Sequence, residues 1–95
     1  MQLEIITPES NLFSGEVVAV QLPGKDGLFQ VLNNHAPIIS ALTKGTIKVD
    51  LSQPLKNTKK LNKRVQVDAS NKVLTIDVDG GVVELTNNKL ILLAE

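Results

Sequence analysis

His35 is the single histidine of the chain, and histidine is the side chain that most often acts as a general base in enzymes. It lies in the run Asn33-Asn34-His35-Ala36-Pro37, and no Gly-X-Ser-X-Gly nucleophile elbow occurs in the sequence. Nucleophilic catalysis also needs a group that orients the base, and the sequence identifies none. The pattern therefore predicts a structural or interface role for His35, and a small hydrolase that uses this base has no further support.

The acidic run Asp77-Val78-Asp79-Gly80 looks like the start of a calcium loop, in which oxygen ligands recur at alternate positions. The pattern then fails, because its fifth, sixth and twelfth positions hold Gly81, Val82 and Asn88. Strand alternation explains the run better, since it places both aspartates on the solvent-exposed face of a strand that ends in a Gly-Gly turn. With one His and no Cys, we expect no metal site and no cofactor.

Phosphate and nucleic-acid sites are also disfavoured. The glycine-containing run from Pro23 to Gly27 lacks the spacing of a phosphate-binding loop and precedes no helical pattern, so we expect it to form an exposed hairpin tip. Ten Lys and Arg balance ten Asp and Glu, which gives no overall attraction to polyanions. Two Phe, with no Tyr or Trp, leave little surface on which bases could stack.

The length of 95 residues suits one domain, residues 1–95, with a core built from Val, Ile and Leu. No apolar stretch approaches the roughly 20 residues of a membrane-spanning helix. The first residues lack the basic segment and apolar run of a secretory signal, so the sequence does not indicate export.

Apolar residues alternate with polar ones almost throughout, as in Leu74, Ile76 and Val78, and this period of two predicts half-buried strands. Turn residues separate the strands, among them Ser14-Gly15, Asp26-Gly27 and Asn87-Asn88, the last of which predicts a two-residue hairpin. We expect an all-β fold, a flattened β-sandwich or barrel of about nine to ten short strands with no substantial helix. The predicted strands are 3–7, 16–22, 28–32, 38–42, 46–51, 64–68, 73–78, 82–86 and 89–93.

A lysine-rich segment at about residues 52–64 interrupts this pattern. It carries four Lys and Arg64, half of the basic residues of the chain, with only Leu55 and Leu61 as apolar side chains. It predicts a protruding loop or an extended hairpin. Without interleaved aromatics or glycine-rich turns, it is more typical of a solvated surface loop than of a site for phosphates, lipid headgroups or nucleic acid.

Several phrases, taken in order, resemble one family: the epsilon subunit of the F-type ATP synthase, called delta in mitochondria. No single phrase is specific, but their order and spacing follow the family over nearly the whole chain apart from Leu51 to Lys72. The phrases are Leu3 to Glu9, Leu12 to Val17, Pro23 to Leu28, Asn34-His35-Ala36-Pro37, Leu42 to Gly45, Gly80 to Leu85 and Leu93-Ala94-Glu95.

The resemblance implies a non-catalytic subunit of the central stalk, present as one copy in a hetero-oligomer and without cofactor. Such a subunit joins the gamma subunit to the membrane c-ring and carries torque during ATP synthesis or hydrolysis coupled to ion transport. It is a peripheral protein at the cytoplasmic face of a bacterial membrane, with no span of its own. The alternative from composition alone is a free-standing β-sandwich recognition module for a peptide or glycan.

The family's motifs also assign two groups of candidate contact residues. The candidates for contact with the c-ring lie in one turn, where Leu28 takes a family position that is often acidic: Gly24, Lys25, Asp26, Gly27 and Leu28. The candidates for contact with gamma follow it: His35, Ala36, Pro37 and Ser40.

The sequence departs from the family's pattern in two places. Typical members continue after the Leu-Ala-Glu phrase into a hairpin of two helices that in bacteria can inhibit hydrolysis, whereas this sequence ends at Glu95, so we expect no inhibition of that kind from it. The stretch from Leu51 to Lys72 is longer than the family's usual hairpin at this point, which puts the local strand register in question.

Overall fold

The computed structural model describes residues 1–59 and 61–95, and within these residues the chain forms nine strands and no helix. The all-β prediction is therefore confirmed. The strands are β1 (Gln2–Ile6), β2 (Asn11–Gly24), β3 (Gly27–Leu32), β4 (Ile38–Leu42), β5 (Gly45–Leu51), β6 (Val65–Val67), β7 (Val73–Val78), β8 (Gly81–Thr86) and β9 (Lys89–Ala94).

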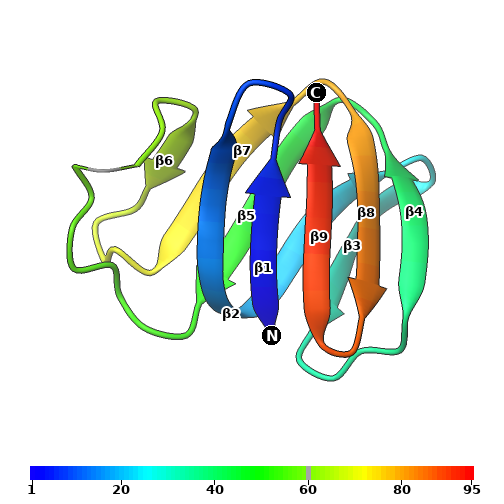
Figure 1. Cartoon of the computed structure of the whole chain (residues 1–95), viewed down its shortest axis with the longest axis horizontal. Helices are drawn as coiled ribbons and strands as arrows, with labels where there is room; N and C mark the ends of the chain where they lie inside the picture. Colours follow the sequence, from blue (N-terminus) through cyan, green and yellow to red (C-terminus); the bar gives the residue numbers. More distant parts are fainter. Residues whose placement is uncertain (60) are drawn as a thin grey trace.

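The strands form two facing layers, which Figure 1 views from the side of the front layer. In the front layer, β2 pairs with β1, β1 runs parallel to β9, and antiparallel pairs then link β9 to β8 and β8 to β4. In the rear layer, β3, β2, β5, β7 and β6 follow one another through antiparallel pairs. At the edge of the front layer away from β1, β4 pairs with the end of β2 only at Gly24 and Leu42. Because a single pair joins the two layers at this edge, the fold is a flattened sandwich and not a closed barrel.

Strand β2 takes part in both layers. Its residues 11–16 pair with β1, and after a register shift between Val17 and Ala19 its second half pairs with β5 and β3. The predicted turn at Ser14-Gly15 is therefore wrong. The Phe13 ring covers Gly15, where an added Cβ would lie 2.9 Å from the ring, so this glycine makes room for a side chain inside a continuous strand.

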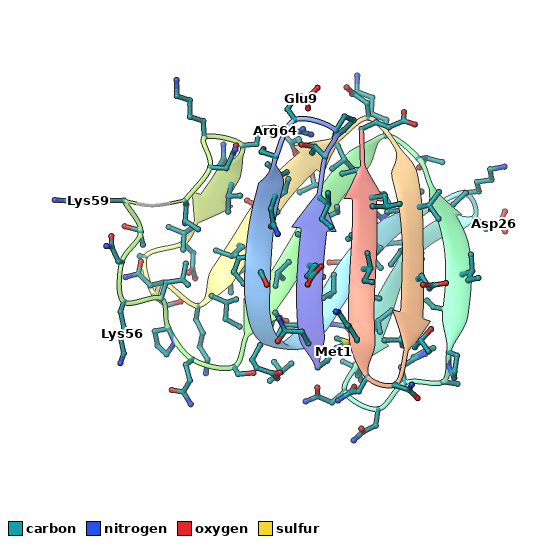
Figure 2. The ribbon with its side chains drawn as sticks, in the orientation of Figure 1. Met1, Glu9, Asp26, Lys56, Lys59 and Arg64 are labelled. Carbon is teal, nitrogen blue, oxygen red and sulfur yellow. The ribbon has the colours of Figure 1, made fainter. Side chains whose placement is uncertain are left out.

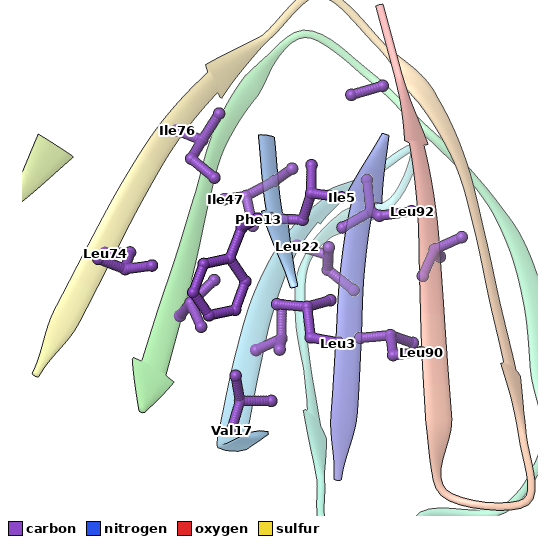
Figure 3. Packing of buried hydrophobic residues seen from close by; sticks show 14 of the residues in the cluster. Leu3, Ile5, Phe13, Val17, Leu22, Ile47, Leu74, Ile76, Leu90 and Leu92 are labelled. Carbon is purple, nitrogen blue, oxygen red and sulfur yellow. The ribbon is translucent and has the colours of Figure 1, made fainter. Parts of the chain in front are cut away.

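The core lies between the layers and is almost entirely aliphatic, as composition predicted (Figure 3). Alternate residues of each strand point inward, because successive side chains of a strand lie on opposite faces. The fully buried side chains of the front layer include Leu3, Ile5, Leu85, Leu90 and Leu92, and those of the rear layer include Leu22, Ile47, Leu74 and Ile76.

Two predicted turns have the expected backbone. Asn87 and Asn88 have φ values of 52° and 60° and join β8 to β9, which confirms the two-residue hairpin. Lys25 and Asp26 form the two-residue tip between the paired Gly24 and Gly27. The predicted strand 64–68 is shorter in the structure, since β6 spans Val65–Val67.

Asp68 organises the turn between β6 and β7. Its carboxylate accepts hydrogen bonds from the Ser70 hydroxyl at 2.8 Å and from the backbone N–H groups of Lys72 and Val73 at 3.2 and 3.1 Å. These bonds, led by that from Ser70, lower the pKa of Asp68 below its ordinary value because they favour the charged carboxylate.

Two glycines with positive φ, Gly81 at the start of β8 and Gly27 at the start of β3, provide a matched test of the packing around Gly81. Gly81 has a φ of 153°, and an added Cβ would lie 2.3 Å from the Leu93 carbonyl oxygen, whereas Gly27 has a φ of 120° with nothing within 4 Å. We expect Gly81→Ala to lower the free energy of unfolding by at least about 2 kcal/mol, and Gly27→Ala by about 1 kcal/mol from backbone strain alone. Urea denaturation of both variants measures the difference, and equal losses would contradict this packing.

Asp68 predicts a pH dependence of stability. A carboxylate with a lowered folded-state pKa stabilises the native state above its unfolded pKa of about 4, and this contribution disappears as pH falls through the folded value. We therefore expect Asp68→Asn to be less stable than the unchanged chain at neutral pH, with the gap closing in acid. Urea titrations from neutral pH to about pH 2 measure the gap, and a gap that stays constant over this range would contradict the assignment.

Candidate partner-binding surfaces

The β2–β3 hairpin brings all five predicted ring-contact residues to one tip. Lys25 and Asp26 are exposed there, and Leu28 beside them is 66% exposed. Figure 2 shows Asp26 at one extremity of the molecule. A shallow groove of about 360 Å³ separates this tip from β4, and it is lined by the hairpin residues Gly24 to Phe29 together with Ser40 and Ala41.

Three of the four predicted gamma-contact residues lie in the loop between β3 and β4. His35, Ala36 and Pro37 are exposed, and hydrogen bonds tie the loop to the β8–β9 turn of the front layer and to the end of β3 in the rear layer. The Asn34 N–H donates to Oδ1 of Asn88 at 2.8 Å, and the His35 N–H donates to the Leu32 carbonyl at 3.1 Å. Nδ1 of the His35 ring lies 2.7 Å from the Ala36 carbonyl oxygen, and this hydrogen bond orients the ring.

Ser40, the fourth predicted gamma contact, lies apart from the other three. It is half-buried on β4, where its hydroxyl donates to the Ala41 carbonyl at 3.3 Å and its side chain lines the groove beside the β2–β3 hairpin. The structure therefore groups Ser40 with the candidate ring-contact residues, and it places His35 to Pro37 near the turn of the β8–β9 hairpin.

The outer face of the front layer carries an apolar surface that the sequence reasoning missed. Strand register aligns Ala41 on β4, Val82 on β8, Leu93 on β9 and Ile6 on β1 in one row across four strands. Val82 is 45% exposed and Leu93 is 53% exposed, and Ile39, two residues before Ala41 on the same face, is 74% exposed. We call these five residues the apolar face.

A shallow groove continues the apolar face at its upper end. It has a volume of about 380 Å³ and lies between the start of the β1–β2 turn, the start of β8 and the end of β9. Its lining is mostly apolar and includes Ile6, Pro8, Val82 and Leu93. A contiguous exposed apolar surface of this kind is typical of a protein-protein contact, because soluble proteins rarely leave one uncovered.

A polar row crosses the middle of the outer face of the rear layer, although the exposed Leu28 and Leu32 lie on the same face of β3. Register aligns a row of five polar side chains across β3, β2, β5, β7 and β6: Gln30, Gln21, Lys48, Thr75 and Gln66. The row from Ala41 to Ile6 therefore differs from this row in chemistry, because it joins apolar side chains of four adjacent strands, and it suits burial against a partner.

The acidic run at the end of β7 does not assemble a metal centre. Asp77 and Asp79 are exposed, and Asp77 Oδ1 accepts a hydrogen bond from the Thr46 hydroxyl at 2.6 Å. In the part of the chain that the structure describes, no three His or acidic residues are placed to hold a metal ion. Within the same residues, no helix is long and apolar enough to cross a membrane.

Comparison with known proteins identifies the family. Residues 1–60 match the family model described as "ATP synthase, Delta/Epsilon chain, beta-sandwich domain". The ATP synthase epsilon chain of Chlorobium limicola is 36% identical over 94 residues, covering 99% of this chain and 88% of that protein. The epsilon chain of Chlorobaculum tepidum is 38% identical over 93 residues, covering 98% and 86%.

Other relatives are longer. The chain spans 61% of the epsilon chain of Leptospira borgpetersenii, to which it is 30% identical. A similar fold occurs in the cryo-EM structure of the Tetrahymena thermophila mitochondrial ATP synthase central stalk and c-ring, with a TM-score of 0.71 at 15% identity; the match covers 99% of this chain and 62% of that one. The Euglena gracilis mitochondrial enzyme gives a TM-score of 0.72 at 15% identity, covering 97% and 48%.

These matches confirm the resemblance inferred from the ordered motifs. They also agree with the expectation of a non-catalytic subunit, which rests on family membership. The chain belongs to the delta/epsilon family of ATP synthase chains and has the family's β-sandwich fold.

Proposed function

We propose that this chain is the central-stalk subunit that couples the gamma subunit of an F-type ATP synthase to the membrane c-ring and transmits torque between them. It works as one copy in the complex, as a peripheral protein at the cytoplasmic face of a bacterial membrane. The apolar face is the observation that supports this proposal most strongly, since a torque-bearing subunit must be held by a partner over an extended, well-packed contact.

The gamma subunit is proposed to lie against the apolar face. Ile39 on β4 lies two residues after Pro37, so the loop that contains His35 and Pro37 adjoins the apolar face at this residue. The polar tip at Lys25 and Asp26 projects beyond this surface and suits contact with a second partner, the c-ring. The rigid aliphatic core between the layers resists shear because close-packed interiors deform little.

The backbone of the hairpin supports a fixed contact with the ring. Six registered pairs from Ala19↔Leu32 to Gly24↔Gly27 hold the hairpin, and the Thr43 N–H donates to the Pro23 carbonyl at 2.9 Å. The tip is therefore attached to both layers of the sandwich. Gly24, Lys25, Asp26, Gly27 and Leu28 are the proposed ring contacts, with Leu28 as an apolar contact.

The assembly experiment tests the function directly. A chain tagged in its native host should co-purify with gamma, the catalytic subunits and the c-ring after mild solubilisation of membranes, in fixed proportion and in the fractions that hydrolyse ATP. Recovery of the tagged chain alone, while the synthase elutes with another epsilon-like subunit, would overturn the proposal and favour a free-standing recognition module.

Substitutions on the apolar face test where gamma binds. We expect Ile39→Ser together with Leu93→Ser to weaken binding of the purified gamma subunit by about tenfold or more, because two exposed apolar side chains lose their burial in the complex. Val18→Ser is the matched control, since Val18 is 41% exposed but lies beside Asp50 and Lys72 of the rear layer. Titration calorimetry gives both affinities, and equal effects of the two changes would place gamma elsewhere.

A charge exchange at the hairpin tip tests the ring contact. We expect Lys25→Glu with Asp26→Lys to reduce retention of the c-ring with the tagged complex and to leave the melting temperature of the isolated chain unchanged, because both side chains are exposed. The same exchange at Lys48 and Asp50 on β5 keeps the net charge and serves as the control. Unaltered retention would show that these two charges make no contact with the ring.

A further inference from the structure

The zero net charge of the chain conceals a strong separation of charge. Residues 52–64 contain five basic residues and no acidic residue. The remaining residues therefore hold 10 − 5 = 5 basic and 10 acidic side chains, which gives +5 in the segment and −5 in the rest of the chain. Like charges repel one another within such a segment, and a surface of opposite charge would relieve this repulsion. We call residues 52–64 the basic spur.

The basic spur is anchored to the sandwich at two points. Leu55 and Leu61 are half-buried against the core, and the Leu55 N–H donates to the Asn71 carbonyl at 2.8 Å. Two asparagines shape the backbone between these anchors and β6, since the side chains of Asn57 and Asn62 accept hydrogen bonds from the N–H groups two residues further on, each at 3.0 Å. These contacts hold the described residues of the spur in a defined conformation that projects from the sandwich.

The anchors leave the charged side chains at the surface. Lys56, Lys59 and Lys63 are exposed. Among the described residues, the two ion pairs join the amino terminus to Glu16 and Lys89 to Glu4, and both lie outside the spur. Arg64 differs from the lysines because its guanidinium donates to the backbone oxygens of Asp77 and Glu95, each at 3.1 Å. Arg64 therefore fixes the base of the spur, while Lys56, Lys59 and Lys63 face solvent.

The spur and the β2–β3 hairpin lie at opposite ends of the molecule. Figure 2 places Lys59 at one end of the longest axis and Asp26 at the other, and the molecule extends 32 Å along this axis. The screening length at physiological ionic strength is only about 8 Å. A membrane or ring surface that contacts the hairpin tip would therefore be screened from the lysines of the spur.

We propose that the basic spur docks an acidic protein segment of the synthase on the side of the rotor away from the c-ring. The inference rests on the proposed function, because the orientation of the hairpin toward the ring defines which side the spur faces. Carboxylates on a flexible or helical segment are the partners that exposed lysines recognise as point charges. The contact adds an electrostatic attachment at the end of the sandwich opposite the β2–β3 hairpin.

Other anionic partners fit the spur less well. Phosphate recognition favours arginine forks, but the one arginine of the spur is bonded to backbone oxygens. Neither phenylalanine lies in the spur: Phe13 is on β2 and Phe29 is on β3. The segment thus lacks aromatic side chains for stacking on bases or for anchoring in a membrane interface.

Crosslinking in the intact synthase tests the proposal. A zero-length carbodiimide joins lysine amines to contacting carboxylates, and mass spectrometry identifies both partners. We expect Lys56, Lys59 or Lys63 to be joined to acidic residues of another subunit, with a yield that falls as salt rises from about 0.05 M to about 0.5 M. Lys56→Glu with Lys59→Glu and Lys63→Glu removes these amines, so its readout is binding: at about 0.05 M salt, retention of the chain in the synthase should fall by about tenfold. Lys44→Glu with Lys48→Glu and Lys72→Glu, an equal change of charge outside the spur, should leave the spur crosslinks in place.

The outcomes separate the two proposals. Co-purification of the chain with the synthase, without any spur crosslink to a protein subunit, would overturn the docking inference and leave the proposed function standing. Binding of the purified chain to vesicles rich in phosphatidylserine, lost in the spur variant but kept in the control variant, would assign the spur to a membrane and also overturn the inference. Failure to co-purify would remove the basis of both.

Discussion

The continuity of strand β2 is the constraint on which the rest of the structure depends. One strand of 14 residues pairs with β1 in the front layer and with β5 and β3 in the rear layer, so a displacement of one layer must be passed to the other through its backbone. Val17, Val20 and Leu22 on this strand are fully buried. A strand held by hydrogen bonds along its length and by apolar contacts at its faces cannot slip by one residue without exposing its core side chains.

This shared strand explains how a small domain without a large interior can serve as a mechanical joint. The hairpin tip at Lys25 and Asp26 extends directly from the rear half of β2, and the apolar face lies on strands that β1 connects to its front half. Load applied at the tip therefore reaches the apolar face through registered pairs and a packed aliphatic core. The proposed coupling between a ring at one surface and gamma at the other uses this direct path.

The proposed contact with gamma accounts for the apolar row on the outer face of the front layer. The row from Gln30 to Gln66 on the rear layer presents polar side chains to solvent, as an exposed sheet face does. Val82 and Leu93 on the front layer present apolar side chains instead. Such residues are stable in water only at a cost, which burial against a permanent partner removes.

Much of the architecture could be predicted from local pattern. Alternation located all nine strands, and the paired asparagines at 87 and 88 specified a tight hairpin because asparagine tolerates positive φ. The ordered motifs identified the family, which supplied the contact residues that no local pattern indicates. The hairpin tip at Lys25 and Asp26 could also be predicted, because Gly24 and Gly27 flank the turn.

The parts that could not be predicted depend on distant pairings. Ser14-Gly15 has the composition of a turn, but the Phe13 ring packed over Gly15 keeps the segment in a strand. To predict the apolar face, one must know that residues 41, 82, 93 and 6 lie in register across four strands. Alternation with a period of two does not indicate which strands are neighbours. The sequence did contain one indication of the apolar face, because Lys89–Ala94 carries apolar residues on both faces of the strand. The family's motifs assign Ser40 and His35 to one contact segment, and only the strand arrangement shows that Ser40 lines the groove beside the hairpin.

A cryo-EM structure of the assembled synthase that contains this chain would show which face gamma covers. We expect gamma to cover the β1, β9, β8 and β4 face around Val82 and Leu93, the β2–β3 tip to rest on the c-ring, and the β5 and β7 face to remain in solvent. A complex in which gamma instead covers the polar row around Lys48 and Thr75, leaving Leu93 exposed, would contradict this expectation.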